Sequence, residues 1–106
     1  MSFTVTYRDG RMFDGDIARI GDLLEQLDGP LDDEYPNVSV RDDDTEWVVS
    51  AFQTGLLVFE NVEEEDGEPR HMENVTRPEM LRVMEMLARG ELNEIELLDW
   101  RPGYGP

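Results

Sequence analysis

The sequence predicts an α+β protein: an antiparallel, meander-like sheet of about five strands, with two main helices packed on one face. Three observations lead to this prediction. Runs of β-branched and aromatic residues recur along the chain, two segments carry apolar residues at helical spacing, and the connections between the strand-like runs are short. Short connections favour antiparallel pairing because a parallel step requires a long crossover.

The N-terminal part predicts one strand followed by one helix. Residues 3–7 alternate apolar side chains with threonine, which is typical of a half-buried strand. Apolar residues then recur at spacings of three and four over residues 17–27, which predicts an amphipathic helix. Asp14 or Asp16 is placed to cap this helix, and the Asp28-Gly29-Pro30 run ends it.

The central part predicts four strands. Residues 38–41 alternate valine with polar residues. The runs 47–53 and 56–62 flank Thr54-Gly55, so they predict a hairpin at the centre of the sheet. Residues 70–75 predict one further strand.

The C-terminal part predicts the second main helix. In the run Thr76-Arg77-Pro78-Glu79, a capping threonine precedes a first-turn proline and a glutamate three residues after the cap, and Gly90 ends the helix. Asn93 and Glu96 predict one further capped helical turn. The apolar residues of 97–100 predict an extended tail against the core, and residues 101–106 predict no regular structure.

Two helices can cover only one face of such a sheet. Trp47, Val49 and Ala51 are expected on one face, with Val48 and Phe52 on the other. Either Trp100 and the tail cover the second face, or part of that face stays exposed for binding.

Composition limits the classes of protein to consider. The length of 106 residues predicts a single domain, residues 1–106, and the lack of cysteine excludes a disulfide scaffold. No apolar run approaches the ~18 residues of a membrane helix, and the N-terminus does not resemble a secretory signal. We therefore expect a cytoplasmic protein.

Charge is the most unusual property of the chain. Nine basic residues oppose 26 acidic ones, which gives a formal net charge of −17. Such a charge disfavours binding to nucleic acid or an anionic membrane and favours a protein partner with a basic surface. A role in solubility alone is the simpler alternative.

The sequence offers little for catalysis or metal binding. It contains no cysteine or lysine, and its single histidine, His71, lies beside Arg70 in a polar strand, where we expect it at the surface or half buried. The acidic run 42–47 lacks the glycine that an EF-hand loop needs at position six. We expect no enzymatic activity, no metal and no cofactor.

The acidic residues gather in two predicted connections of the meander. Residues 42–46 join the second and third predicted strands, and residues 63–68 join the fourth and fifth. Alternate turns of a meander fall at the same end of a sheet, on the order of 10 Å apart. The candidate partner-binding residues are these nine carboxylates, here called the acidic rim: Asp42, Asp43, Asp44, Glu46, Glu63, Glu64, Glu65, Asp66 and Glu68.

The rim admits two interpretations. Like charges this close together destabilise the fold, and a partner that presents arginine and lysine would relieve their repulsion. Alternatively, charged turns protect the sheet from edge-to-edge aggregation.

Four stretches, FTVTYRDGR, VVSAFQTGLLVFENVEE, RHMENVTRPE and LLDWRPGYG, together resemble the Imm-one group of immunity proteins from bacterial polymorphic toxin systems. The resemblance covers nearly the whole chain, with the stretches in the right order, and its Trp100–Gly103 ending is expected to be structural. It implies an α+β protein, encoded beside a toxin that is often a nucleic-acid deaminase. The immunity protein would bind this toxin and block its active site or its nucleic-acid-binding surface.

Two other functions fit the sequence. The chain could be an acidic nucleic-acid mimic that inhibits a DNA-binding protein, or a small metal- or ligand-binding module. A mimic would compete with several unrelated DNA-binding proteins, whereas an immunity protein would recognise one toxin.

Overall fold

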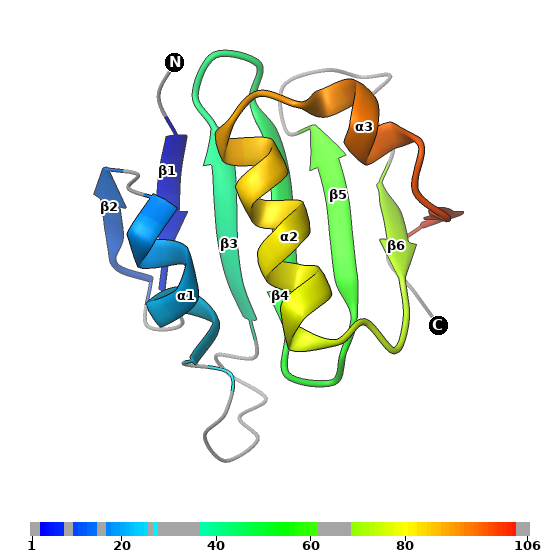
Figure 1. The fold of residues 1–106 in the computed structure, drawn as a ribbon, viewed down its shortest axis with the longest axis horizontal. Helices are drawn as coiled ribbons and strands as arrows, with labels where there is room; N and C mark the ends of the chain where they lie inside the picture. Colours follow the sequence, from blue (N-terminus) through cyan, green and yellow to red (C-terminus); the bar gives the residue numbers. More distant parts are fainter. Residues whose placement is uncertain are drawn as a thin grey trace.

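A seven-stranded antiparallel sheet forms the centre of the computed structural model, and the main helices lie across one of its faces (Figure 1). The structure describes residues 3–7, 10–14, 17–25, 27, 37–61 and 69–103. Within them the strands run in the spatial order β2-β1-β3-β4-β5-β6-β7, so apart from β1 and β2 they follow the order of the chain. The predicted α+β fold, with its mostly meander connections and two packed helices, is confirmed.

The strands and helices have the following bounds. The strands are β1 (Phe3–Thr6), β2 (Met12–Asp14), β3 (Asn37–Asp42), β4 (Trp47–Phe52), β5 (Leu57–Asn61), β6 (Arg70–Met72) and β7 (Arg101–Pro102). The helices are α1 (Ile17–Glu25), α2 (Arg77–Ala88) and α3 (Leu92–Glu96).

The core lies between the sheet and the helices. The sequence pattern explains this core. Apolar residues alternate along the strands and recur at helical spacing along the helices, so each element buries one apolar side. The buried sheet residues at its centre are Val5, Val38, Val40, Val49, Ala51, Leu57 and Phe59. The helices contribute Ile20, Leu23, Leu24, Met80, Val83, Met84 and Leu87.

Two short edge strands were not predicted. β2 has a single partly buried residue, Phe13, so its sequence carries little alternation. β7 contains Pro102, which cannot donate a ladder hydrogen bond and is therefore tolerated only at an edge. The expectation that residues 101–106 form no regular structure is wrong for Arg101 and Pro102; residues 104–106 lie outside the described part of the chain.

Three further local predictions need correction. Asp14 belongs to β2 and does not cap α1, while Asp16 lies outside the described residues. α3 is present, but it begins after Glu91 without a side-chain cap. Leu97 was predicted to lie against the core, but it is 83% exposed.

The N-terminus of α2 was predicted correctly. Thr76 is its N-cap, and the Thr76 hydroxyl accepts a hydrogen bond from the backbone N–H of Glu79 at 3.4 Å. We expect Thr76→Ala to lower the free energy of unfolding by about 1 kcal/mol, because one helix N–H loses its partner. Chemical denaturation measures this loss, and Thr76→Asn, which can still cap, is expected to restore most of it.

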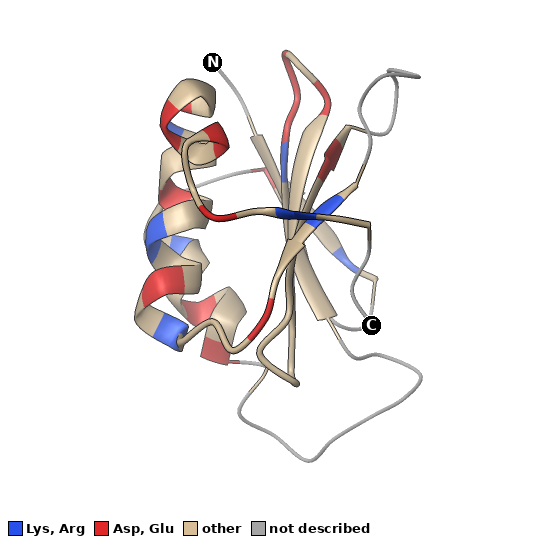
Figure 2. Cartoon of the chain, turned by 90° about the vertical axis from the view of Figure 1, so that its right-hand side faces the viewer, with Lys and Arg blue, Asp and Glu red and all other residues tan. Residues whose placement is uncertain are grey.

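The second face of the sheet carries no helix among the described residues (Figure 2). The strand register places Thr6, Ser39, Ser50, Val58 and His71 in one row across this face. Trp100 does not cover it, because the Trp100 ring packs with the core on the helical face.

The described part of the chain has no helix that is long and apolar enough to cross a membrane. The radius of gyration is 12.5 Å, close to the value expected for one compact domain of this length.

Candidate functional site

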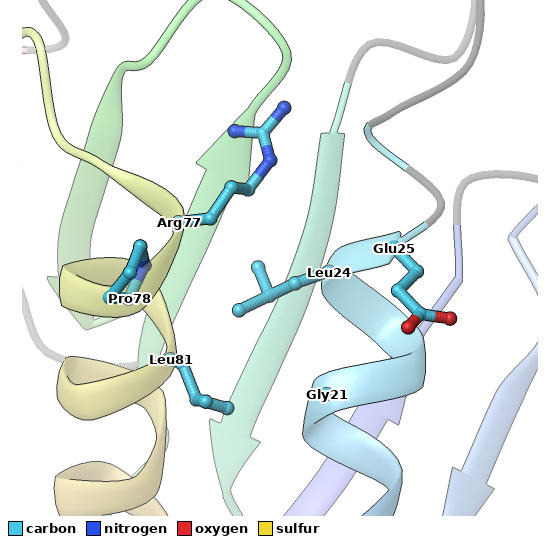
Figure 3. Close-up of a pocket in the computed structure, with 6 residues that line it drawn as sticks. All are labelled: Gly21, Leu24, Glu25, Arg77, Pro78 and Leu81. Carbon is cyan, nitrogen blue, oxygen red and sulfur yellow. The ribbon is translucent and has the colours of Figure 1, made fainter.

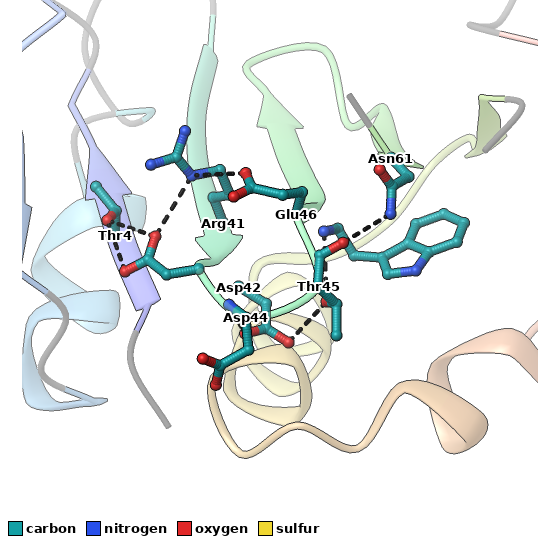
Figure 4. Close-up of polar contacts among 9 residues, drawn as sticks. Thr4, Arg41, Asp42, Asp44, Thr45, Glu46 and Asn61 are labelled. Carbon is teal, nitrogen blue, oxygen red and sulfur yellow. Dashed lines mark hydrogen bonds and ion pairs between the residues drawn. The ribbon is translucent and has the colours of Figure 1, made fainter. Parts of the chain in front are cut away.

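The described half of the acidic rim is the loop between β3 and β4, which projects at one end of the sheet (Figures 1 and 2). It contains Asp42, Asp43, Asp44, Thr45 and Glu46. Side-chain hydrogen bonds and ion pairs hold almost every residue of this loop, as Figure 4 shows.

Asp42 shapes the loop from the inside. Its side chain is only 4% exposed, and its carboxylate accepts hydrogen bonds from the Asp44 backbone N–H at 3.0 Å and the Thr45 hydroxyl at 2.8 Å. Its backbone carbonyl accepts a third bond, from the Glu46 N–H at 2.8 Å. Asp42 was predicted to face a partner, but its carboxylate is committed to this turn, so it determines the loop conformation.

Asp43 and Glu46 lie on either side of Arg41. The Arg41 Nε is 3.4 Å from the nearer Asp43 oxygen and 3.6 Å from the nearer Glu46 oxygen. The Thr4 hydroxyl donates to Asp43 at 2.9 Å, which ties the loop to strand β1. Both carboxylates are partly exposed, and a single guanidinium offsets them.

Asp44 is the exposed carboxylate at the tip of the loop. Together, Asp43, Asp44 and Glu46 present three negative charges at the surface against the one positive charge of Arg41. The loop therefore offers a net negative surface on which Arg41 holds the side chains of Asp43 and Glu46.

Glu46 adopts a backbone conformation that ordinarily favours glycine. Its φ is +65°, in the left-handed region, where side chains with a Cβ are strained. The hydrogen bond from its N–H to the Asp42 carbonyl closes the loop in this conformation. The sequence contains glycine at other left-handed positions, including Gly55, but it places a carboxylate here.

Two substitutions of Glu46 distinguish the strain of its backbone from the charge of its side chain. We expect Glu46→Gly to raise the free energy of unfolding by about 1 kcal/mol, because glycine adopts the left-handed conformation without a steric penalty. Glu46→Gln keeps the strain and removes the charge, so it serves as the matched control. Thermal denaturation of the two variants distinguishes them, and an unchanged or lower stability for Glu46→Gly would contradict the strained geometry.

The other half of the rim begins at the end of β5. Asn61, the last residue of β5, is buried, and its amide donates to the Thr45 carbonyl at 2.8 Å. Trp47 and Asn61 are paired in the register, so β3 and β5 end at the same end of the sheet, as the meander predicts. Glu63, Glu64, Glu65, Asp66 and Glu68 follow, but they lie outside the described residues, so their distance from the β3–β4 loop stays a prediction.

A layer of aromatic rings begins at Trp47, the first residue after the loop. The Trp47 ring stacks on Phe59 with centroids 4.5 Å apart, and Phe59 stacks on Trp100 at 5.4 Å. The Arg70 guanidinium lies 5.7 Å from the centroids of both Trp47 and Phe59, and it pairs with Glu96 at 3.6 Å. The Trp100 indole N–H also donates to the Ile95 carbonyl at 2.6 Å, which agrees with the structural role expected for this residue.

His71 differs from its prediction. It is only 8% exposed, and its Nδ1 is 3.1 Å from the Gly103 carbonyl. Among the described residues no group of three or more His, Asp or Glu side chains is arranged to hold a metal ion.

Comparisons with protein-family models, with curated proteins and with solved structures find no match to this chain. Its function therefore has to be argued from its own residues and fold.

Proposed function

We propose that this chain is a cytoplasmic immunity protein that binds a cognate bacterial toxin, a member of the nucleic-acid deaminase superfamily, and neutralises it. The four stretches that resemble Imm-one immunity proteins support this proposal. The α+β fold agrees with what that resemblance implies.

The observation that carries the proposal is the constrained acidic loop between β3 and β4. Asp42 and Asn61 fix its backbone before any partner arrives, so binding loses little conformational entropy there. Its three surface carboxylates, on a chain of net charge −17, accelerate the approach of a basic partner.

A deaminase is a suitable target for such a surface. These enzymes hold a zinc-activated water in a pocket that accepts an unstacked base, and basic residues beside the pocket bind the phosphates of the substrate. An acidic loop over that basic surface would exclude the nucleic acid by occupying its place. Inhibition of this kind requires no catalytic group from the inhibitor.

The β3–β4 loop can form only part of the interface. A stable complex buries about 1,600 Å² in total, which is far more than one five-residue loop supplies. Residues 63–68, which follow the strand tied to this loop through Asn61, are the next candidates.

Binding measurements with purified proteins test the proposal. The chain is mixed with the toxin domain encoded beside it and, separately, with several unrelated DNA-binding proteins. We expect tight binding to the toxin alone, with an association rate that falls as salt is added. Binding to several of the DNA-binding proteins would instead favour the nucleic-acid mimic, and absence of binding to the toxin would contradict the proposal.

A further inference from the structure

An apolar groove lies between α1 and α2 on the outer surface of the helical layer (Figure 3). Its volume is about 280 Å³, and it is lined by Gly21, Leu24, Glu25, Arg77, Pro78 and Leu81. Leu24 and Leu81 point toward each other from the two helices. A cavity of roughly 150 Å³ holds a benzene molecule, so this groove has room for a large apolar side chain.

Gly21 keeps this groove open. It lies in the middle of α1, where glycine costs about 0.5–1 kcal/mol relative to alanine. Its backbone is not in the left-handed region, and a Cβ built there meets no atom within 4 Å. Neither the backbone conformation of Gly21 nor its packing against the described residues requires glycine, so a molecule that approaches α1 closely from outside would account for it.

Ile17 extends the apolar surface beyond the groove. It lies one turn before Gly21 on the same side of α1, and it is 39% exposed. Pro78 is exposed on the opposite wall, at the start of α2.

Helices α1 and α2 together carry no net charge, in contrast to the rest of the chain, including α3 with its Glu94 and Glu96. Their four basic residues, Arg19, Arg77, Arg82 and the C-cap Arg89, balance their four acidic ones, Asp22, Glu25, Glu79 and Glu85. The whole net charge of −17 therefore belongs to the rest of the sequence. Two copies of so acidic a chain repel each other least where these neutral faces meet.

We propose that this neutral helical face binds a second copy of the same chain, in a two-fold symmetric dimer whose closest approach is at Gly21. In such a dimer each surface patch meets its own copy, so a patch that carries both basic and acidic residues can pair them across the two-fold axis. Ile17 and Pro78 of each copy supply apolar side chains for the facing groove. A standard interface of about 800 Å² per copy is roughly an eighth of the 6277 Å² surface of the chain.

This inference is independent of the proposed function. The β3–β4 loop lies at an end of the sheet, and the groove lies on the outer surface of the helices. Each copy in the dimer keeps its acidic loop exposed, so loss of self-association leaves toxin binding by that loop intact.

Sedimentation velocity of the full chain over a wide concentration range tests the dimer. We expect a reversible monomer–dimer equilibrium at physiological salt. Gly21→Gln is expected to weaken it at least about tenfold, because the new side chain starts where a Cβ has open space and occupies the surface that the second copy would approach. Met12→Gln places the same side chain at an exposed position of β2, on the face of the sheet away from the helices, and it should leave the equilibrium unchanged.

A chain that remains monomeric at every concentration would overturn the inference, as would a dimer that Gly21→Gln and Met12→Gln affect equally. If the chain is monomeric and Gly21→Gln instead weakens toxin binding, the groove belongs to the toxin interface and the self-association is refuted. Circular dichroism of both variants verifies that α1 remains folded.

Discussion

Neutralising the three surface carboxylates of the β3–β4 loop is expected to lower the rate of association with the cognate toxin about tenfold at low salt. The variant combines Asp43→Asn, Asp44→Asn and Glu46→Gln, which preserve side-chain size while removing three negative charges. The effect should shrink as salt is added, because screening already weakens the attraction in the unaltered protein. Stopped-flow mixing of chain and toxin at several salt concentrations measures it.

A second triple variant provides the matched control. Glu73→Gln, Glu79→Gln and Asp99→Asn remove the same total charge from exposed residues that line a separate depression beside β6 and α2. If both variants slow association equally, overall charge steers the encounter and the β3–β4 loop has no special part in it. The set Glu63→Gln, Glu64→Gln, Glu65→Gln and Asp66→Asn tests the second half of the rim, and an unchanged rate would remove that segment from the interface.

Phe59→Ala is expected to lower the free energy of unfolding by about 3–5 kcal/mol. The Phe59 ring is fully buried between Trp47 and Trp100, so its removal loses two stacking contacts and leaves a cavity in the core. Chemical denaturation measures the loss. Phe52→Ala, at a partly exposed position outside the core cluster, should cost markedly less, and equal losses would contradict the central place of the stack.

Much of the fold could be predicted because the apolar spacing is strong where the elements are long. The spacing of apolar residues matches only one kind of secondary structure in each of β3, β4, β5 and the capped helix α2. The two missed strands, β2 and β7, have three and two residues, too few to establish an alternation. Their pairing depends on neighbouring strands that the local sequence does not reveal.

The position of the acidic loop was predictable, but the roles of its residues were not. The meander places the loop at one end of the sheet, whereas a run of carboxylates does not indicate which one turns inward. Asp42 turns inward because the Asp44 N–H and the Thr45 hydroxyl lie within hydrogen-bonding distance of its carboxylate. Asn61 and Thr45 are 16 residues apart in the sequence, so their hydrogen bond forms only because β4 and β5 pair in the sheet.

Titration of the toxin with this chain tests the central claim most directly. The proposed cognate toxin is sought in the gene beside this one, and its activity on nucleic acid is measured while increasing amounts of the chain are added. The proposed function predicts a stoichiometric loss of activity that reaches completion at one chain per toxin domain. Full toxin activity in the presence of a large excess of folded chain would contradict it.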